Sequence, residues 1–259
     1  MNDIIYLLDM ENPLFVSQEK PKLEITPMSL LRESDLDDVQ TLVQYEKITH
    51  DFLILTVENI EAIGNYLESR IDYYKSKGIS TPSIVEVGAG NGRLTHFLTE
   101  KLHRDNYVYD IIPTDDFSWE KSEHDAIPIH ANVAPYNNKE AVQIFEPTIV
   151  ICSMMTPNGD LSADFRKVSS VQEYILLGHR GGTGQEWDTH GEDFYGVGKE
   201  IYKDSQKRYY GEPPFVKDGF DRIDIEDVSK YFVENKNIKY IDDVINREQR
   251  HHCDSFRRK

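Results

Sequence analysis

The sequence predicts an α/β protein in which a doubly wound, mostly parallel sheet carries helices on both faces. Short β-branched runs alternate with amphipathic stretches between residues 83 and 178, and this alternation is typical of parallel strands joined by helical crossovers. A cluster of three glycines directly follows the first of these runs. With 259 residues, of which 39% are hydrophobic, the chain is long enough to bury a large core.

Two helices are predicted ahead of the sheet. Ser34 is a candidate N-cap for a stretch with apolar residues at helical spacing, and Thr56 is the expected N-cap of a second helix that ends near Gly78. We therefore expect residues 1–80 to form an N-terminal helical cap or lid. Residues 81–259 are expected to form the sheet domain that holds the ligand.

Seven strands are expected after residue 80. Five of them are predicted to be parallel, and a last pair is predicted to run antiparallel and to close one edge of the sheet. Between the two groups, residues 179–198 contain six glycines and are predicted to form a long, ordered, functional loop. The expected strands are SIVEV (83–87), YVYDIIPTD (107–115), DAIPIHANV (125–133), PTIVICSMM (147–155), VQEYILLGH (171–179), and two within FDRIDIEDVSKYF (220–232) and CDSFRRK (253–259).

The glycine cluster lies in the stretch IVEVGAGNGRLTHFL, between the first strand and the helix that follows it. A turn of this kind lets the backbone approach a nucleotide-like ligand closely. A dinucleotide-binding fingerprint needs a glycine where Arg93 stands, and a Walker phosphate loop needs a Lys-Ser/Thr pair that this stretch lacks. The spacing is instead Glu86-x-Gly88-x-Gly90-x-Gly92.

This spacing resembles the first motif, E/D-x-G-x-G-x-G, of the class I S-adenosylmethionine-dependent methyltransferases. The resemblance implies a Rossmann-like fold and S-adenosyl-L-methionine as the cofactor, with the loop running beneath the methionine part. That ligand is a sulfonium cation without a phosphate, so a cradle of backbone amides beside a carboxylate suits it. The order of elements resembles the family over about residues 83–178. The loop residues expected to bind the cofactor are Glu86, Gly88, Ala89, Gly90 and Gly92.

Two later strand ends supply further cofactor-binding candidates. Asp115 ends the second strand, 27 residues after Gly88, where an acidic side chain commonly binds the ribose hydroxyls. Asp116 is the neighbouring alternative, and a turn-capping role for Asp115 stays open. By the same resemblance, Asn132 is expected to meet the adenine amino group and Val133 to line the adenine face.

Candidate catalytic residues are harder to identify, because methyl transfer mainly requires orientation and shielding from water. A general base is needed only when the acceptor starts protonated. Ser153 follows the fourth strand, near the expected position of the methyl group, and is a further cofactor-binding candidate. His179 ends the fifth strand, His190 lies near Trp187 in the glycine-rich loop, and Tyr45 belongs to the cap. The aromatic and acidic residues of this glycine-rich loop favour a cationic or planar acceptor.

Charge and cysteine content limit the partners. The formal net charge of −17 argues against binding to a nucleic-acid backbone, and the basic tail REQRHHCDSFRRK is expected to be a solvated terminal strand. Two cysteines without CxxC or zinc spacing predict neither a disulfide framework nor a metal site. The apolar runs predict no signal peptide and no membrane segment, so we expect a cytoplasmic or nuclear protein; its oligomeric state is open.

The sequence therefore predicts an enzyme that methylates N or O of a small-molecule or protein acceptor. A non-catalytic S-adenosylmethionine-binding protein that regulates a partner is the alternative. Aminopropyl transfer would need a pair of aspartates after the fourth strand, where only Asp160 lies nearby, and Arg93 disfavours a nicotinamide dehydrogenase. The fourth strand ends in CSMMTPNGD rather than the N/D-P-P-Y/F motif of many enzymes that methylate base amines or glutamine amides, which disfavours those acceptors.

Overall fold

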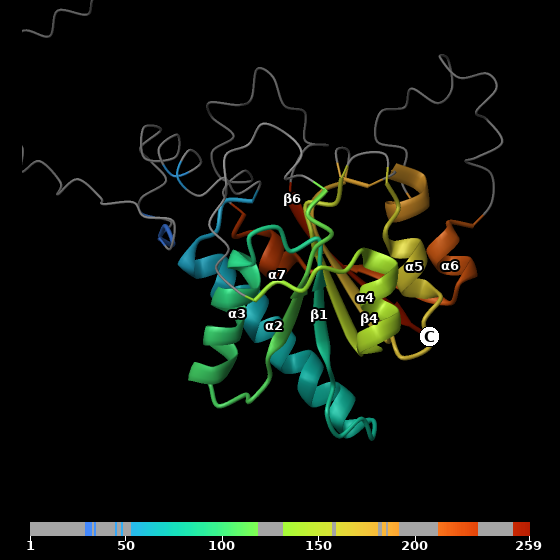
Figure 1. The fold of residues 1–259 in the computed structure, drawn as a ribbon, viewed down its shortest axis with the longest axis horizontal. Coiled ribbons are helices and arrows are strands. Elements are labelled where there is room, and N and C mark those ends of the chain that lie inside the picture. Colours follow the sequence, from blue (N-terminus) through green and yellow to red (C-terminus); the bar gives the residue numbers. More distant parts are fainter. Residues whose placement is uncertain are drawn as a thin grey trace, which may run out of the picture.

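The chain folds around one six-stranded sheet with a layer of helices on each face (Figure 1). The computed structural model describes residues 29–32, 34, 45, 48, 53–118, 132–156, 159–180, 183–184, 186–191, 212–232 and 251–259. Within these ranges, the helices are too short or too polar to cross a lipid bilayer.

The described strands and helices alternate along the first part of the chain, as predicted. The strands are β1 (Ile84–Val87), β2 (Ile111–Thr114), β3 (Ile149–Ser153), β4 (Glu173–His179), β5 (Phe220–Asp224) and β6 (His251–Arg258). The helices are α2 (Val57–Ser76), α3 (Arg93–Arg104), α4 (Asn138–Phe145), α5 (Ser162–Arg166), α6 (Pro214–Lys217) and α7 (Glu226–Ser229), with a π-helical turn η3 (Glu186–His190).

The strand order is β2-β1-β3-β4-β6-β5. Strands β1 to β4 pair in parallel, whereas β6 runs antiparallel to both β4 and β5. The predicted parallel sheet and its antiparallel closing pair are therefore confirmed. The carboxyl ends of β1 to β4 share one edge of the sheet, which is the usual edge for a ligand site.

The expectation that the basic tail is a solvated strand is wrong. β6 lies between β4 and β5, and Cys253 and Phe256 are fully buried in it. The charged end of the strand is accommodated because the guanidinium of Arg258 donates to backbone carbonyls, including that of Val171 at 2.9 Å. A strand inside a sheet has both faces covered. The charged residues at the ends of β6 suggested an exposed strand instead, so the sequence did not indicate this interior position.

The expected third strand, DAIPIHANV (125–133), falls mostly outside the described residues, which form six strands. The residue that follows it, Ala134, pairs in parallel with Thr114 at the end of β2. The Ala134 N–H donates to the Pro113 carbonyl at 2.9 Å, and the Asp115 N–H donates to the Ala134 carbonyl at 3.1 Å. A complete strand on the outer side of β2 stays a prediction.

Among the described residues, three helices cover each face of the sheet. α2, α3 and α7 lie on one side and α4, α5 and α6 on the other (Figure 1). Side chains alternate between the two cores along β3: Ile149 and Ile151 belong to the first, Val150 and Cys152 to the second. This alternation follows from the two-residue period of a strand.

The helix predicted after Thr56 is α2, and a capping box of Thr56 and Asn59 begins it. It packs in the same core as the sheet rather than above its carboxyl edge. The helix expected after Ser34 lies largely outside the described residues. The N-terminal helical cap is thus not confirmed, and the division at residue 80 stays a prediction.

A buried carboxylate joins α2 to the sheet. Glu173, the first residue of β4, is fully buried and accepts hydrogen bonds from Arg70 Nε at 2.5 Å, Tyr66 Oη at 2.5 Å, Tyr74 Oη at 2.9 Å and Ser255 Oγ at 2.7 Å. Burial, and then the negative charge of Glu173, raise the pKa of both tyrosines, so they remain donors. This network lies at the amino edge of the sheet, opposite the ligand edge.

We expect Glu173→Gln to lower the free energy of unfolding by about 3–5 kcal/mol, because it leaves the Arg70 guanidinium buried without a counterion. Urea denaturation followed by circular dichroism measures this change. Glu100→Gln is the matched control, since the Glu100 side chain is 65% exposed, and its effect should stay within about 0.5 kcal/mol. Equal stability of the two variants would contradict a structural role for this network.

Candidate functional site

The turn between β1 and α3 presents bare backbone to an open space. Gly88, Gly90 and Gly92 have φ angles of 68°, 55° and 78°, in the left-handed region that side chains disfavour. A Cβ atom added at Gly88 or Gly90 would meet no other atom within 4 Å. The glycines therefore serve the conformation of the turn and leave room for a ligand to lie against its main chain.

Most amides of this turn already have partners within the chain. The Ala89 N–H donates to the Thr114 carbonyl at 3.0 Å, and the Gly92 N–H donates to the Ala89 carbonyl at 2.8 Å. The Gly90 N–H donates to Asp115 Oδ2 at 2.8 Å. A phosphate cradle needs several N–H groups that converge on the anion, so this arrangement favours a ligand without a phosphate.

Two carboxylates lie beneath the turn. Glu86 in β1 is 2% exposed and accepts a hydrogen bond from the Thr95 hydroxyl; Asp115 follows β2 and is 6% exposed. Burial, and then these two carboxylates, raise the pKa of the neighbouring Cys152 thiol to about 12. The negative potential that disfavours a thiolate here would favour a cation bound over the turn.

Asp115 and Asp116 differ in what they contact. Asp115 accepts from the Gly90 N–H through Oδ2 and from the Phe117 N–H at 2.7 Å through Oδ1, so it fixes the glycine turn to the end of β2. Asp116 is exposed and accepts from the Ser118 N–H at 2.9 Å.

The other cofactor-binding candidates lie at the same edge of the sheet. Ser153 is the last residue of β3, next to β1 in the sheet. Asn132 is exposed and Val133 is half-buried, and both directly precede the residue that pairs with β2. The structure thus brings these candidates, the glycine turn and Asp115 to one edge, and their contacts with a cofactor stay predictions.

The three catalytic candidates occupy different environments. His179 ends β4, and its Nδ1 atom is buried without a hydrogen-bond partner among the described residues. Tyr45 is fully buried; its hydroxyl donates to the Leu55 carbonyl at 3.2 Å and accepts from Arg93 at 2.8 Å. The Tyr45 hydroxyl is thus hydrogen-bonded to Leu55 and Arg93 within the protein. This position does not support its predicted catalytic role.

His190 is also buried, with 3% of its surface exposed. Its Nε2 lies 3.0 Å from the Thr183 carbonyl and its Nδ1 3.7 Å from Asp254 Oδ2. These contacts are typical of a histidine that holds the turn η3 on the sheet. Of the candidate catalytic residues, His179 alone combines a strand end at the ligand edge with an imidazole nitrogen that has no partner among the described residues.

Sequence reasoning missed the contribution of β6 to this edge. His251 begins β6 and lies opposite His179, with ring centroids 5.7 Å apart. Asp254, three residues further along β6, accepts a hydrogen bond from Arg180 Nε at 2.7 Å. The adjacent histidines in RHHCDS were the available signal, but they indicate a site only once β6 is known to pair with β4. Among the described residues, no group of three or more acidic, His or Cys side chains is placed to hold a metal ion.

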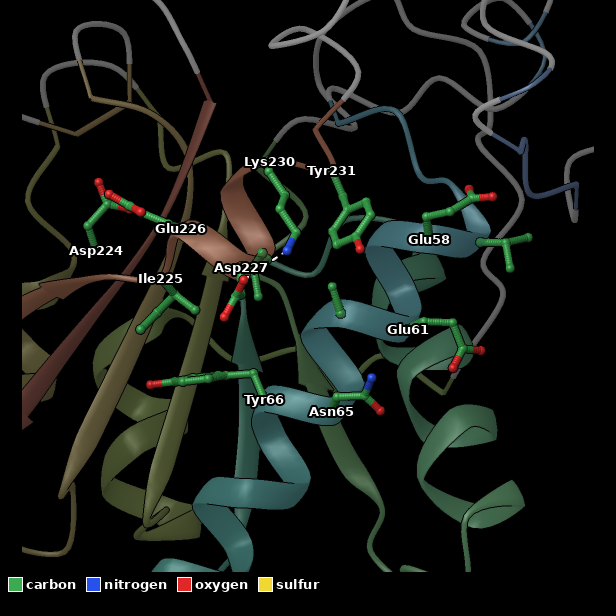
Figure 2. Close-up of a pocket in the computed structure, with 13 residues that line it drawn as sticks. Glu58, Glu61, Asn65, Tyr66, Asp224, Ile225, Glu226, Asp227, Lys230 and Tyr231 are labelled. Carbon is green, nitrogen blue, oxygen red and sulfur yellow. Dashed lines mark hydrogen bonds and ion pairs between the residues drawn. The ribbon is translucent and has the colours of Figure 1, made fainter.

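A separate groove of about 810 Å³ lies between α2 and α7 (Figure 2). It is lined by acidic side chains that include Glu58, Glu61 and Glu226, while Lys230 is paired with Asp227 at 2.8 Å. The groove does not include the glycine turn, so its size does not identify it as the cofactor site. The geometry of the turn is the stronger indication, because it combines left-handed backbone, open space and carboxylates.

Solved structures similar to this chain are methyltransferases. One is the plantazolicin methyltransferase BpumL in complex with SAH, at 10% identity and a TM-score of 0.36, covering 78% of this chain and 86% of that chain. Another is magnesium protoporphyrin IX methyltransferase (ChlM) from Synechocystis PCC 6803 with bound SAM, at 11% identity and a TM-score of 0.31, covering 76% and 80%. No protein-family model and no curated protein sequence matches the chain. Because the likenesses are distant, the functional conclusion depends on the glycine turn itself.

Both cysteines should be unreactive in the folded protein. Cys152 and Cys253 are fully buried, and burial is the main cause that raises the pKa of each thiol; the thiolate is the reactive form. With Ellman's reagent at pH 8 we expect no labelling of the native chain and two thiols per chain in denaturant. Stoichiometric labelling of native Cys152 would show that the space beneath the turn is open to solvent.

Proposed function

We propose that this chain binds S-adenosyl-L-methionine and transfers its methyl group to an N or O atom of a small-molecule or protein acceptor. The observation that carries the proposal is the turn from Glu86 to Gly92, with three left-handed glycines, an open outer face and most of its amides hydrogen-bonded within the chain. A sulfonium cation without a phosphate suits such a turn above two carboxylates.

The candidates along the ligand edge follow the parts of the cofactor in order. The turn would lie beneath the methionine part, Asp115 or Asp116 at the end of β2 would bind the ribose, and Asn132 with Val133 would contact the adenine. Ser153, at the end of β3, would lie on the side of the reacting methyl group. The bound cofactor supplies an electrophilic methyl carbon, and the protein contributes orientation and exclusion of water.

The acceptor is expected on the side of β3 and β4, because the glycine turn and β2 are assigned to the cofactor. The chain has a formal net charge of −17, which makes a nucleic-acid acceptor unfavourable and a neutral or cationic acceptor favourable. This charge and the buried carboxylates near the turn support small-molecule and protein acceptors alike.

The first test is binding of the cofactor. Isothermal titration calorimetry should show binding of S-adenosylmethionine and S-adenosylhomocysteine and none of NAD. Gly88→Val should weaken both by at least about tenfold, or about 1.4 kcal/mol, because its side chain enters the open space and its φ of 68° is strained.

Gly78→Val is the matched control for this variant. Gly78 also has a positive φ, of 95°, and no atom within 4 Å of an added Cβ, but it follows α2 at the opposite edge of the sheet. The control should lose stability and keep its affinity. Binding of NAD alone, or equal effects of the two glycine variants, would contradict the proposed site.

The second test separates the two aspartates. Asp115→Asn should weaken S-adenosylmethionine binding by about 1–3 kcal/mol, the usual size for a lost charged hydrogen bond, because Asp115 also holds the Gly90 amide. Asp116→Asn should change the affinity less than about twofold, since the side chain is exposed. The reverse order of effects would assign the ribose to Asp116.

Catalysis is tested by turnover. Formation of S-adenosylhomocysteine is measured with pooled metabolites and with a cell protein extract as sources of acceptor, and the Gly88→Val variant serves as the background. Product formed by the unmodified chain and not by the variant supports a methyltransferase. Tight binding without turnover in either pool would favour the alternative, a non-catalytic regulatory protein.

A further inference from the structure

Two histidines from distant parts of the sequence meet at the ligand edge of the sheet. Because β6 runs antiparallel to β4, its first residue, His251, lies opposite the last residue of β4, His179. Their rings are 5.7 Å apart with an interplanar angle of 76°. Phe232 packs on the other side of His251, with ring centroids 6.0 Å apart, so the His251 ring is held in place.

The surroundings of His179 disfavour its charged form. The groups that lower its pKa are, after burial itself, His251 on β6 and His190 on η3. Burial also lowers the pKa of His251 to about 4. The guanidinium of Arg180, the next residue in the chain, donates to Asp254 at 2.7 Å and to Asp224 at 2.8 Å, and these two carboxylates are therefore already paired. Both imidazoles are thus neutral at pH 7.

The position of His179 suits a role at the acceptor. β4 is two strands from β1, which corresponds to about 10 Å from the glycine turn. β3 lies between these two strands in the sheet, and Met154, the residue after β3, donates its N–H to the Leu177 carbonyl of β4 at 2.7 Å. His179 is half-buried rather than enclosed, and its Nδ1 has no partner among the described residues.

We propose that His179 accepts the proton of the methyl acceptor and that His251 positions it. The inference rests on the proposed methyltransferase function and narrows its substrate class. The acceptor would be a compound whose nucleophilic oxygen or nitrogen is still an O–H or N–H group at pH 7, such as a hydroxyl or an azole. A thioether or tertiary amine acceptor needs no base, and it would leave this neutral imidazole without a function.

The step balances as follows. A lone pair on the acceptor atom forms a bond to the methyl carbon while the carbon–sulfur bond breaks, and the electron pair of that bond goes to sulfur. The proton of the acceptor moves to an imidazole nitrogen of His179, which becomes an imidazolium. Water then takes this proton, and the neutral imidazole is restored. A base of this kind is effective when it is neutral at the working pH.

The test needs no knowledge of the acceptor, because the cofactor and its product differ by one positive charge. Proton–carbon NMR of histidine-labelled protein gives the pKa of His179, assigned with His179→Gln, in the free chain and with S-adenosylhomocysteine or S-adenosylmethionine bound. We expect a value below 6.5 in the free chain. It should be lower by about half a pH unit or more with S-adenosylmethionine than with S-adenosylhomocysteine, because the sulfonium charge repels an imidazolium nearby.

Three comparisons make the result decisive. His179→Gln should bind both ligands within about threefold of the unmodified chain, since the residue is assigned to the acceptor and not to the cofactor. His251→Phe keeps a ring and should keep the difference between the two ligands, whereas His251→Ser should diminish it. Similar differences in His251→Ser and the unmodified chain would remove the positioning role of His251.

The failures are distinguishable. If neither ligand binds, the proposed function itself is wrong. If both bind and the pKa of His179 is the same with each, His179 lies away from the reacting methyl group and the further inference is overturned. Once an acceptor is found, His179→Gln should abolish the fall of kcat/KM at low pH, which loss of a merely structural residue would not do.

Discussion

The structure of the ligand edge depends on one constraint of the backbone: β1 must turn into α3 through three left-handed positions, at Gly88, Gly90 and Gly92. Only glycine adopts this conformation without strain, so the turn fixes its own sequence. Two further contacts depend on this shape. The Ala89 amide reaches the carbonyl at the end of β2, and the Gly90 amide reaches Asp115. The turn, the end of β2 and the acidic side chain therefore form one unit.

Arg93 shows how the turn differs from a dinucleotide-binding loop. It follows the third glycine directly and is 1% exposed, where a dinucleotide fingerprint would have a glycine for close helix packing. Its guanidinium donates to the Ser29 carbonyl at 2.9 Å and the Tyr45 hydroxyl at 2.8 Å, and lies 5.3 Å from the Phe97 ring centroid. The residue that disfavours a nicotinamide dehydrogenase in the sequence therefore joins the N-terminal segment to the base of the turn.

Local patterns predicted the elements and the parallel sheet, whereas the position of β6 between β4 and β5 escaped prediction. The capping residue Thr56, the glycine turn and the β-branched runs each act within a few residues, so the sequence sufficed for α2, β1 and the parallel strands. The place of β6 depends on contacts between residues about 75 positions apart, such as His179 with His251. The charged residues at its ends suggested an exposed strand. The contact between His179 and His251 could therefore not be predicted either. The N-terminal helical cap stays a prediction, because the amphipathic pattern of α2 does not say which surface this helix covers.

The two ends of β4 hold ionisable side chains in opposite charge states. At the amino end of β4, Glu173 is charged, buried and surrounded by four donors, and the charge is tolerated because Arg70 and Ser255 hold it. At the carboxyl end of the same strand, burial lowers the pKa of His179 and so favours its neutral form. A satisfied charge contributes to one rigid structure, whereas a neutral base with an unsatisfied nitrogen retains a capacity to react. The antiparallel strand β6 contributes to both ends of β4, because Ser255 contacts Glu173 and His251 contacts His179. A single strand inserted between β4 and β5 therefore links the stability of the fold to the chemistry of its open edge.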